Sequence, residues 1–242
     1  RWAAKEAMLS GVPITLMYLL RPEIVTWPLA PSDRFSVESE IRNAEEVLEF
    51  ARRTALSRAG PGNPPAIRTE VPRSAPLAGL IDASKDAQMV VVGSRGKGTL
   101  GRLVLGSVSS GLIHHAHCPV TIVHSHLGEL PDAAAPVVVG IDGSPASEAA
   151  TALAFEEAAR RDVDLIAVHA WSDVGRRLLQ GAEWREHKQQ AEEILAERLA
   201  GWQERYPDVR IQRHVDFDQP ARGLIERSRT AQLVVLGSHG RG

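Results

Sequence analysis

Short apolar runs alternate with longer amphipathic segments along the whole chain, the pattern that predicts βαβ units and a parallel sheet. The short runs are apolar at nearly every position, which indicates strands covered on both faces. Predicted strands lie near 13–19, 68–72, 89–93 and 119–123, and then near 136–141, 163–169, 210–215 and 232–237. Predicted helices lie near 1–10, 37–59, 76–86 and 104–116, and then near 145–160, 183–204 and 219–229.

The pattern repeats once along the chain. The segment from Ala87 to Gly98 reappears from Ala231 to Gly242, at an offset of 144 positions. Further upstream the offset is 151, so the second copy holds seven extra residues in a loop-and-helix region where insertions cost little. We therefore predict two tandem domains at 1–126 and 136–242, joined by a linker at 127–135.

Each copy has one element that the other lacks. The strand near 136–141 has no counterpart before Arg1, and the strand near 119–123 has no counterpart before the end at Gly242. We expect each domain to be incomplete here. An intact protein should carry one more strand before Arg1, and a further helix and strand after Gly242.

The bulk composition narrows the class of protein. The 28 basic and 30 acidic residues nearly balance, which argues against a nucleic-acid partner. The single cysteine, Cys118, rules out a disulfide framework within the chain and suits a reducing cytosol. No apolar run approaches the roughly 20 residues of a membrane helix, and no secretory signal is visible. We therefore expect a cytoplasmic protein with no membrane partner.

The main candidate for chemistry is a glycine-rich turn after the strand near 89–93. Gly93 and Gly96 open this turn, and Gly106 and Ser107 follow nine residues later, where a helix should begin. Glycines allow positive φ and close approach to a ligand, and consecutive backbone N–H groups bind anions. A helix N-terminus also attracts phosphate. Two such features close together predict a polyphosphate site rather than only the end of a strand.

Two better-known phosphate motifs fit this turn less well. A Walker loop requires lysine after its second glycine, and Thr99 follows Gly98 instead. A dinucleotide fingerprint matches from Gly96 to Gly101, but it follows the fourth strand of the copy rather than the first. The next strand, moreover, lacks the acidic residue that this fingerprint requires at 119–126.

The combined motifs resemble the universal stress protein family. The resemblance lies in the spacing Gly93-x2-Gly96-x9-Gly106-Ser107, in the strand that ends Gly140-Ile141-Asp142-Gly143-Ser144, and in His-Cys-Pro-Val at 117–120. It covers both copies and is closest to the tandem, ATP-binding type common in actinobacteria. It implies two doubly wound α/β domains, each with a five-stranded parallel sheet of strand order 3-2-1-4-5. The nucleotide would lie at the carboxyl ends of strands one and four.

The resemblance also implies the ligand and its contacts, namely ATP, with or without Mg²⁺. In the first copy the implied contacts are Gly93, Ser94, Arg95, Gly96, Lys97, Gly98, Thr99, Gly106, Ser107, Val108, Ser109 and the backbone at Val71. In the second copy they are Gly140, Ile141, Asp142, the backbone at Val215, Gly237, Ser238, His239, Gly240 and Arg241. His239 stands where the first copy has Arg95, so we expect weaker phosphate binding in the second copy near neutral pH.

Three functions remain open. The leading hypothesis is a nucleotide-dependent sensor of stress or dormancy, because neither a Ser-His-Asp spacing nor paired carboxylates accompany the glycine-rich turn. A slow ATPase or nucleotide-transferring enzyme is the second, with Arg95 and Lys97 stabilising charge but no group to orient water. The third is an interaction scaffold with degenerate nucleotide sites, in which the strand edge at 120–123 pairs with a partner. We expect a homodimer or an intramolecular pseudo-dimer, and a regulatory protein partner.

A dense group of histidines around Cys118 offers a further possibility. Its members are His114, His115, His117, Cys118, His124 and His126. Zinc binds such side chains, but histidines also suit the negative end of a helix dipole, which is the simpler interpretation. Cys118 itself is either a redox sensor or, more simply, a small buried side chain.

Overall fold

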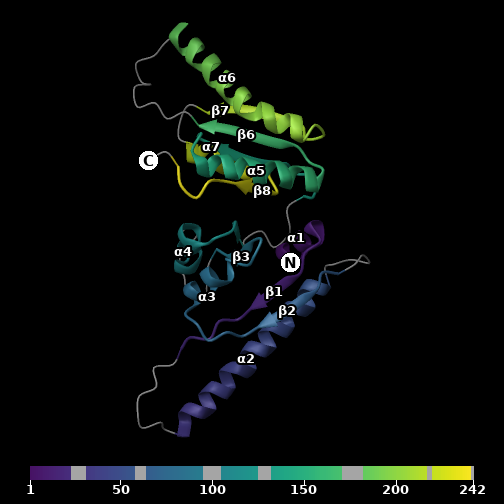
Figure 1. The fold of residues 1–242 in the computed structure, drawn as a ribbon, viewed down its shortest axis with the longest axis vertical. Helices are drawn as coiled ribbons and strands as arrows, with labels where there is room; N and C mark the ends of the chain where they lie inside the picture. Colours follow the sequence, from purple (N-terminus) through teal and green to yellow (C-terminus); the bar gives the residue numbers. More distant parts are fainter. Residues whose placement is uncertain are drawn as a thin grey trace. The chain divides into compact units, whose positions relative to one another are not determined.

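The computed structural model describes residues 1–22, 31–57, 64–94, 105–124, 132–170, 182–216 and 220–240. The chain divides into two compact units, unit 1 (Arg1–Gly128) and unit 2 (Glu129–Gly242), as Figure 1 shows. Both units combine helices with parallel strands, which confirms the predicted α/β class. Part of the linker predicted at 127–135 lies outside the described residues.

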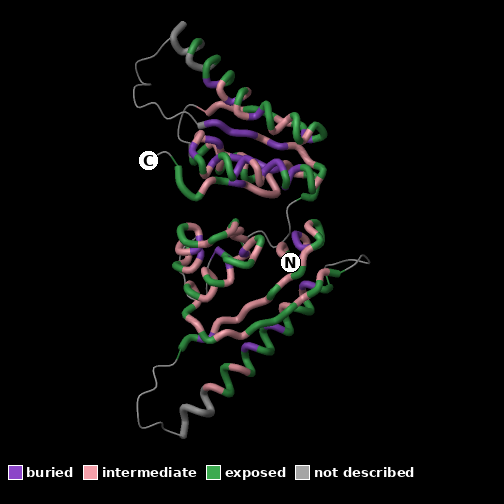
Figure 2. The backbone as a smooth tube through the Cα atoms, in the orientation of Figure 1, coloured by how far each residue is buried: buried purple, intermediate pink, exposed green. Residues whose placement is uncertain are grey.

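Unit 2 is built on a four-stranded parallel sheet. Its strands are β5 (Val137–Ile141), β6 (Leu165–Ala170), β7 (Ile211–Asp216) and β8 (Leu233–Val235), and their order is β7-β6-β5-β8. If the strands of this unit are counted from its own first strand, β5, their order across the sheet is 3-2-1-4. Val137 is paired with Leu165 on one side and with Leu233 on the other. Because β5 lies inside the sheet, its valines are fully buried, which explains the continuous apolar run. Figure 2 shows buried positions concentrated along the strands of unit 2.

Helices cover both faces of this sheet. They are α5 (Pro145–Arg161), α6 (Ala182–Arg205) and α7 (Pro220–Ser228). Val139 belongs to a core with Phe155 of α5 and Leu195 of α6, whereas a Cβ on the next residue, Gly140, would meet Leu224 of α7. Successive strand residues point to opposite faces, so α5 and α6 cover one face and α7 covers the other. The Phe155 ring stacks on Trp202 of α6 at 5.8 Å between centroids.

Unit 1 contains two separate pairs of strands. β1 (Ile14–Met17) pairs with β2 (Ile67–Glu70), and β3 (Val90–Gly93) pairs with β4 (Val120–Val123), all in parallel. The sequence predicted that this copy lacks the first strand of its five-stranded sheet, and the described residues form two pairs rather than one sheet. In unit 2 the central strand β5 connects the two halves of the sheet, and the described part of unit 1 has no strand at the corresponding place.

The helices of unit 1 lie close to their predicted positions. They are α1 (Trp2–Ser10), α2 (Pro31–Leu56), α3 (Pro76–Ala83) and α4 (Ser107–His115). The start predicted near 37 for α2 was wrong, because this helix begins at Pro31, and proline is well tolerated in a first turn. α3 and α4 pack against each other, and a Cβ on Gly111 of α4 would lie 2.6 Å from a methyl group of Leu77.

Candidate functional site

In unit 2, the acid predicted at the end of the first strand lies in a tightly bonded turn. Asp142 follows β5, and its Oδ1 accepts a hydrogen bond from the backbone N–H of Ser144 at 2.8 Å. Gly143 has a φ of 77°, a conformation that side chains disfavour. Ser144 caps α5, since its Oγ accepts from the N–H of Ser147 at 3.2 Å. The Ser147 hydroxyl in turn accepts from the N–H of Gly143 at 3.0 Å.

The chain after β8 runs directly beside this turn. The Ser144 hydroxyl donates to the carbonyl oxygen of His239 at 3.4 Å, across 95 residues of sequence. A Cβ on Gly240 would lie 3.1 Å from Oδ2 of Asp142, and a Cβ on Gly237 would lie 2.9 Å from the carbonyl carbon of Ala146. Glycines therefore let this segment pass the first turn of α5 at close range. The structure thus brings together residues that the sequence predicted separately for this site.

The other residues predicted for the site of unit 2 lie outside the contact between the Asp142 turn and the segment after β8, or outside the described residues. Gly140 and Ile141 lie within β5, and Ile141 is buried in the core while its carbonyl oxygen lies 2.7 Å from Nδ1 of His169. Val215 is the next-to-last residue of β7. Ser238 is exposed, and its hydroxyl lies 2.9 Å from Nδ1 of His239. Arg241 lies outside the described residues.

In unit 1, the two halves of the glycine motif meet at the start of α4. Gly106 donates its N–H to the carbonyl oxygen of Ser94 at 2.9 Å, and the Ser109 hydroxyl donates to the carbonyl oxygen of Gly93 at 2.8 Å. The N–H of Ser94 donates to Val123 at the end of β4. The residues predicted between these halves, Arg95, Gly96, Lys97, Gly98 and Thr99, lie outside the described residues.

The Ser94 hydroxyl is unusual in this arrangement. The residue is 3% exposed, and its Oγ has no hydrogen-bond partner among the described residues. Buried hydroxyls are normally paired, with protein, water or a ligand. The unpaired oxygen lies at the start of the glycine-rich turn, where the sequence predicts a phosphate.

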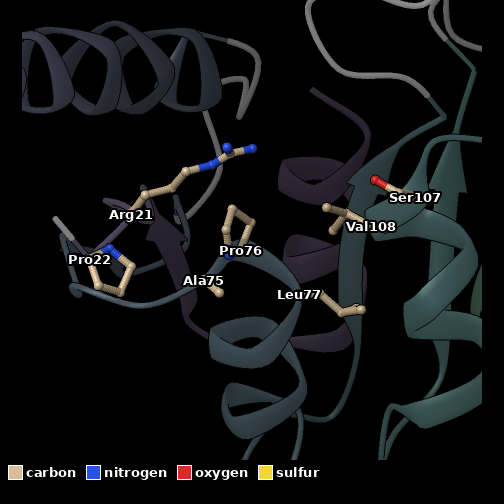
Figure 3. Close-up of a pocket in the computed structure, with 7 residues that line it drawn as sticks. All are labelled: Arg21, Pro22, Ala75, Pro76, Leu77, Ser107 and Val108. Carbon is tan, nitrogen blue, oxygen red and sulfur yellow. The ribbon is translucent and has the colours of Figure 1, made fainter. Parts of the chain in front are cut away.

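A pocket of about 400 Å³ opens beside the same helix start (Figure 3). Its lining comes from the segment after β1, the first turn of α3 and the first turn of α4, and consists of Arg21, Pro22, Ala75, Pro76, Leu77, Ser107 and Val108. The volume lies within the range of small-molecule pockets. Most of the lining is apolar, with one cation and one hydroxyl, and Val71 is not part of it. Ser107 and Val108 were predicted from the sequence, and Arg21 was missed.

A second arginine that the sequence did not identify lies in unit 2. The guanidinium of Arg198, on α6, lies against the turn at Gly143. The helix that contains Arg198 has many charged residues. Nothing in the sequence separates Arg198 from the charged residues on the solvent-exposed face of that helix.

The histidine group of unit 1 forms no metal site within the described residues, where no cluster of three or more His, Cys, Asp or Glu could hold an ion. His117 instead donates its backbone N–H to the Ser84 hydroxyl at 2.9 Å. Burial raises the pKa of the Cys118 thiol, which makes the reactive thiolate less abundant than in an exposed cysteine. His126 lies outside the described residues.

Fold and site together define a tandem of two α/β units in which glycine-rich segments meet helix N-termini beside strand ends. The family model described as the universal stress protein family matches residues 1–124 and 135–242, once for each unit. The chain therefore belongs to the universal stress protein family.

Related proteins agree with this assignment. The chain is 50% identical over 242 residues to a universal stress protein of Mycolicibacterium smegmatis, covering 100% of this chain and 82% of that protein. It is 50% identical over 247 residues to universal stress protein Rv2623 of Mycobacterium tuberculosis, with the same coverage. Among solved structures, a universal stress protein from Archaeoglobus fulgidus shares the fold, with a TM-score of 0.62 and 21% identity over 93% of this chain and 76% of that one. Within the described part of the chain, no helix has the length and apolar character that crossing a bilayer requires.

Proposed function

We propose that this chain is a nucleotide-responsive regulator that binds ATP, with or without Mg²⁺, in each of its two units. The observation that carries this proposal is the close approach of Gly237–Gly240 to the turn at Asp142 and the start of α5. This arrangement places a carboxylate, glycine backbone and a helix N-terminus within one small region at the carboxyl end of the sheet.

The two kinds of group in this region suit the two ends of a nucleotide. Carboxylate oxygens accept hydrogen bonds, so Asp142 would bind donors such as ribose hydroxyls or the adenine amino group. Backbone N–H groups at the start of α5 and along the glycine segment would donate to phosphate oxygens. A ligand with donors at one end and anionic oxygens at the other matches both.

In unit 1, the pocket and the Ser94 hydroxyl support the same function. Pro76, Leu77 and Val108 supply apolar surface for a flat base, and Ser107 lies at the start of α4, where the helix dipole favours an anion. The buried, unpaired oxygen of Ser94 offers one more polar group beside the predicted phosphate position.

We favour regulation over efficient catalysis, and we place the protein in the cytoplasm. The Asp142 carboxylate already accepts a hydrogen bond from Ser144, which supports a binding role for it. We propose that nucleotide occupancy alters contacts with a second copy, with the other unit or with a regulatory protein.

The test is to denature the purified full-length protein and to quantify released nucleotide by chromatography, followed by calorimetry with ATP. We expect about two adenine nucleotides per chain. Ser107→Asp should remove one of them, because the added carboxylate repels phosphate at the start of α4. Gly240→Val should remove the other by crowding Asp142.

Gly201→Ala is the matched control for these variants. Its Cβ would meet no heavy atom within 4 Å, so both nucleotides should remain bound. Absence of released nucleotide together with no calorimetric binding would refute the proposal. Sustained ATP turnover lost in Gly240→Val would replace it with the slow-enzyme hypothesis.

A further inference from the structure

The guanidinium of Arg198 lies directly on the turn that follows β5. A Cβ on Gly143 would be 2.5 Å from one terminal nitrogen of Arg198 and 2.6 Å from its guanidinium carbon. The guanidinium is therefore in van der Waals contact with the backbone of Gly143. Leu195 and Leu199, which flank Arg198 on α6, are both fully buried. The helix is therefore anchored against the core on either side of this arginine, which fixes where the side chain begins.

The Arg198 side chain lacks a partner for one of its enclosed donors. The Nε atom of Arg198 is enclosed and has no hydrogen-bond partner among the described residues. It also lies beside the N-terminus of α5, whose partial positive charge disfavours a cation. Arg198 as a whole is half-buried, but an enclosed polar atom such as its Nε is normally paired.

Another arginine of unit 2, Arg227, is paired with a carboxylate. Arg227 binds both carboxylate oxygens of Asp216, at 2.6 and 3.1 Å. Arg198 contacts the turn at Gly143 closely, but no carboxylate among the described residues is bound to it as Asp216 is bound to Arg227. An anionic group in front of the turn would supply the missing partner and would also be stabilised by the N-terminus of α5.

The sequence of the second copy indicates why a cation is needed here. His239 occupies the position of Arg95 in the first copy, so the second copy lacks the planar, always charged guanidinium at this position. The His239 carbonyl oxygen accepts a hydrogen bond from Ser144, so this segment and Arg198 both adjoin the Asp142–Ser144 turn. Arg198 can therefore supply a charge in place of the arginine that the first copy has at position 95, while Arg241 matches Lys97.

The first copy has alanine, not arginine, at the equivalent position of its helix. Buried positions of α2 and α6 match as Ala44 with Ala191 and Leu48 with Leu195. This match places Ala51 where α6 has Arg198. A cation at this position of the helix is therefore particular to the second copy.

We propose that Arg198 binds the phosphate of the nucleotide in unit 2, so that α6 supplies this site with a cation that the first copy does not have at the equivalent position. The planar guanidinium presents parallel donors that match two phosphate oxygens. This inference rests on the proposed function and makes α6 the element of unit 2 that responds to ligand charge.

The test uses the full-length chain carrying Ser107→Asp, so that calorimetry reports on unit 2. Arg198→Met keeps an unbranched apolar stem but removes the guanidinium, and with it the charge and the donors. It should weaken ATP binding by about tenfold or more, the loss expected for a hydrogen bond to a charged group. Adenosine, which has no phosphate, should bind within about twofold of the unsubstituted protein.

Two further variants separate charge from structure. Arg198→Lys should recover part of the ATP affinity, because it keeps the charge without the planar fork. Arg213→Met, an exposed position on β7, should leave ATP affinity unchanged. Weakening of ATP by Arg198→Met should also be smaller at high salt than at low salt, because exposed charge is screened.

Equal loss of ATP and adenosine binding in Arg198→Met, or no loss of either, would refute the role of Arg198 alone. Absence of ATP binding in the Ser107→Asp protein that retains Arg198 would refute the proposed function of unit 2, and this inference with it.

Discussion

Replacing Gly237 by alanine tests whether the segment after β8 must touch α5 to hold unit 2 and its site together. A Cβ at this position would lie 2.9 Å from the carbonyl carbon of Ala146, 3.0 Å from the nitrogen of Ser147 and 3.1 Å from the Cβ of Ala146. Carbon atoms in contact are normally about 3.5–4.0 Å apart, so the added methyl group overlaps by about half an ångström or more. Two of these three neighbours are backbone atoms, which cannot rotate away.

The segment after β8 and the first turn of α5 would therefore have to move apart. β8 spans only Leu233–Val235 and pairs with β5, so its end is displaced more readily than the first turn of α5. Overpacking of this kind costs about 1–3 kcal/mol, and we expect Gly237→Ala to lower the free energy of unfolding of unit 2 by that amount. The same displacement would move His239 and Gly240 away from Asp142, so ATP binding in unit 2 should weaken as well.

Urea unfolding followed by tryptophan fluorescence measures the loss, because Trp202 stacks on Phe155 in the core of unit 2. Hydrogen exchange of peptides covering β8 and α5 then locates the loss within the unit. Gly201→Ala is the matched control, because a helical alanine with open space around its Cβ should raise stability by about 0.5–1 kcal/mol. The reasoning is refuted if Gly237→Ala unfolds at the same urea concentration as the unsubstituted protein and retains its ATP affinity in unit 2.

Two further predictions follow from particular contacts. Ser144→Ala removes the cap that accepts from the N–H of Ser147, and it should destabilise unit 2 by about 1 kcal/mol in urea unfolding, whereas Ser144→Asp should retain most of the stability. Because burial raises the pKa of the Cys118 thiol, less thiolate is present at pH 8 in the native protein than in the unfolded chain. Iodoacetamide should therefore alkylate native protein more slowly than urea-unfolded protein, with a native rate that rises at higher pH. Equal rates at pH 8 would contradict this.

Secondary structure and the start of α5 could be predicted from local patterns. Ser144 followed by Pro145 matches a capping hydroxyl and a proline at the first helical position, and the structure shows both. The continuous apolar run at 137–139 correctly indicated a strand buried on both faces. The start of α2 was predicted too late, because the helical apolar pattern becomes clear only after its first turns.

The tandem repeat, the α/β class and the glycine-rich positions could all be predicted from the sequence, because each of these depends on residues that are close together along the chain. Only the tertiary structure showed that Ser144 contacts the carbonyl oxygen of His239 and that Arg198 lies on Gly143. Such contacts depend on how α6 is rotated against the core and on how closely the end of β8 approaches α5. Periodicity reveals which face of a helix is buried, but it cannot reveal which distant residue that face, or a long side chain beside it, will meet.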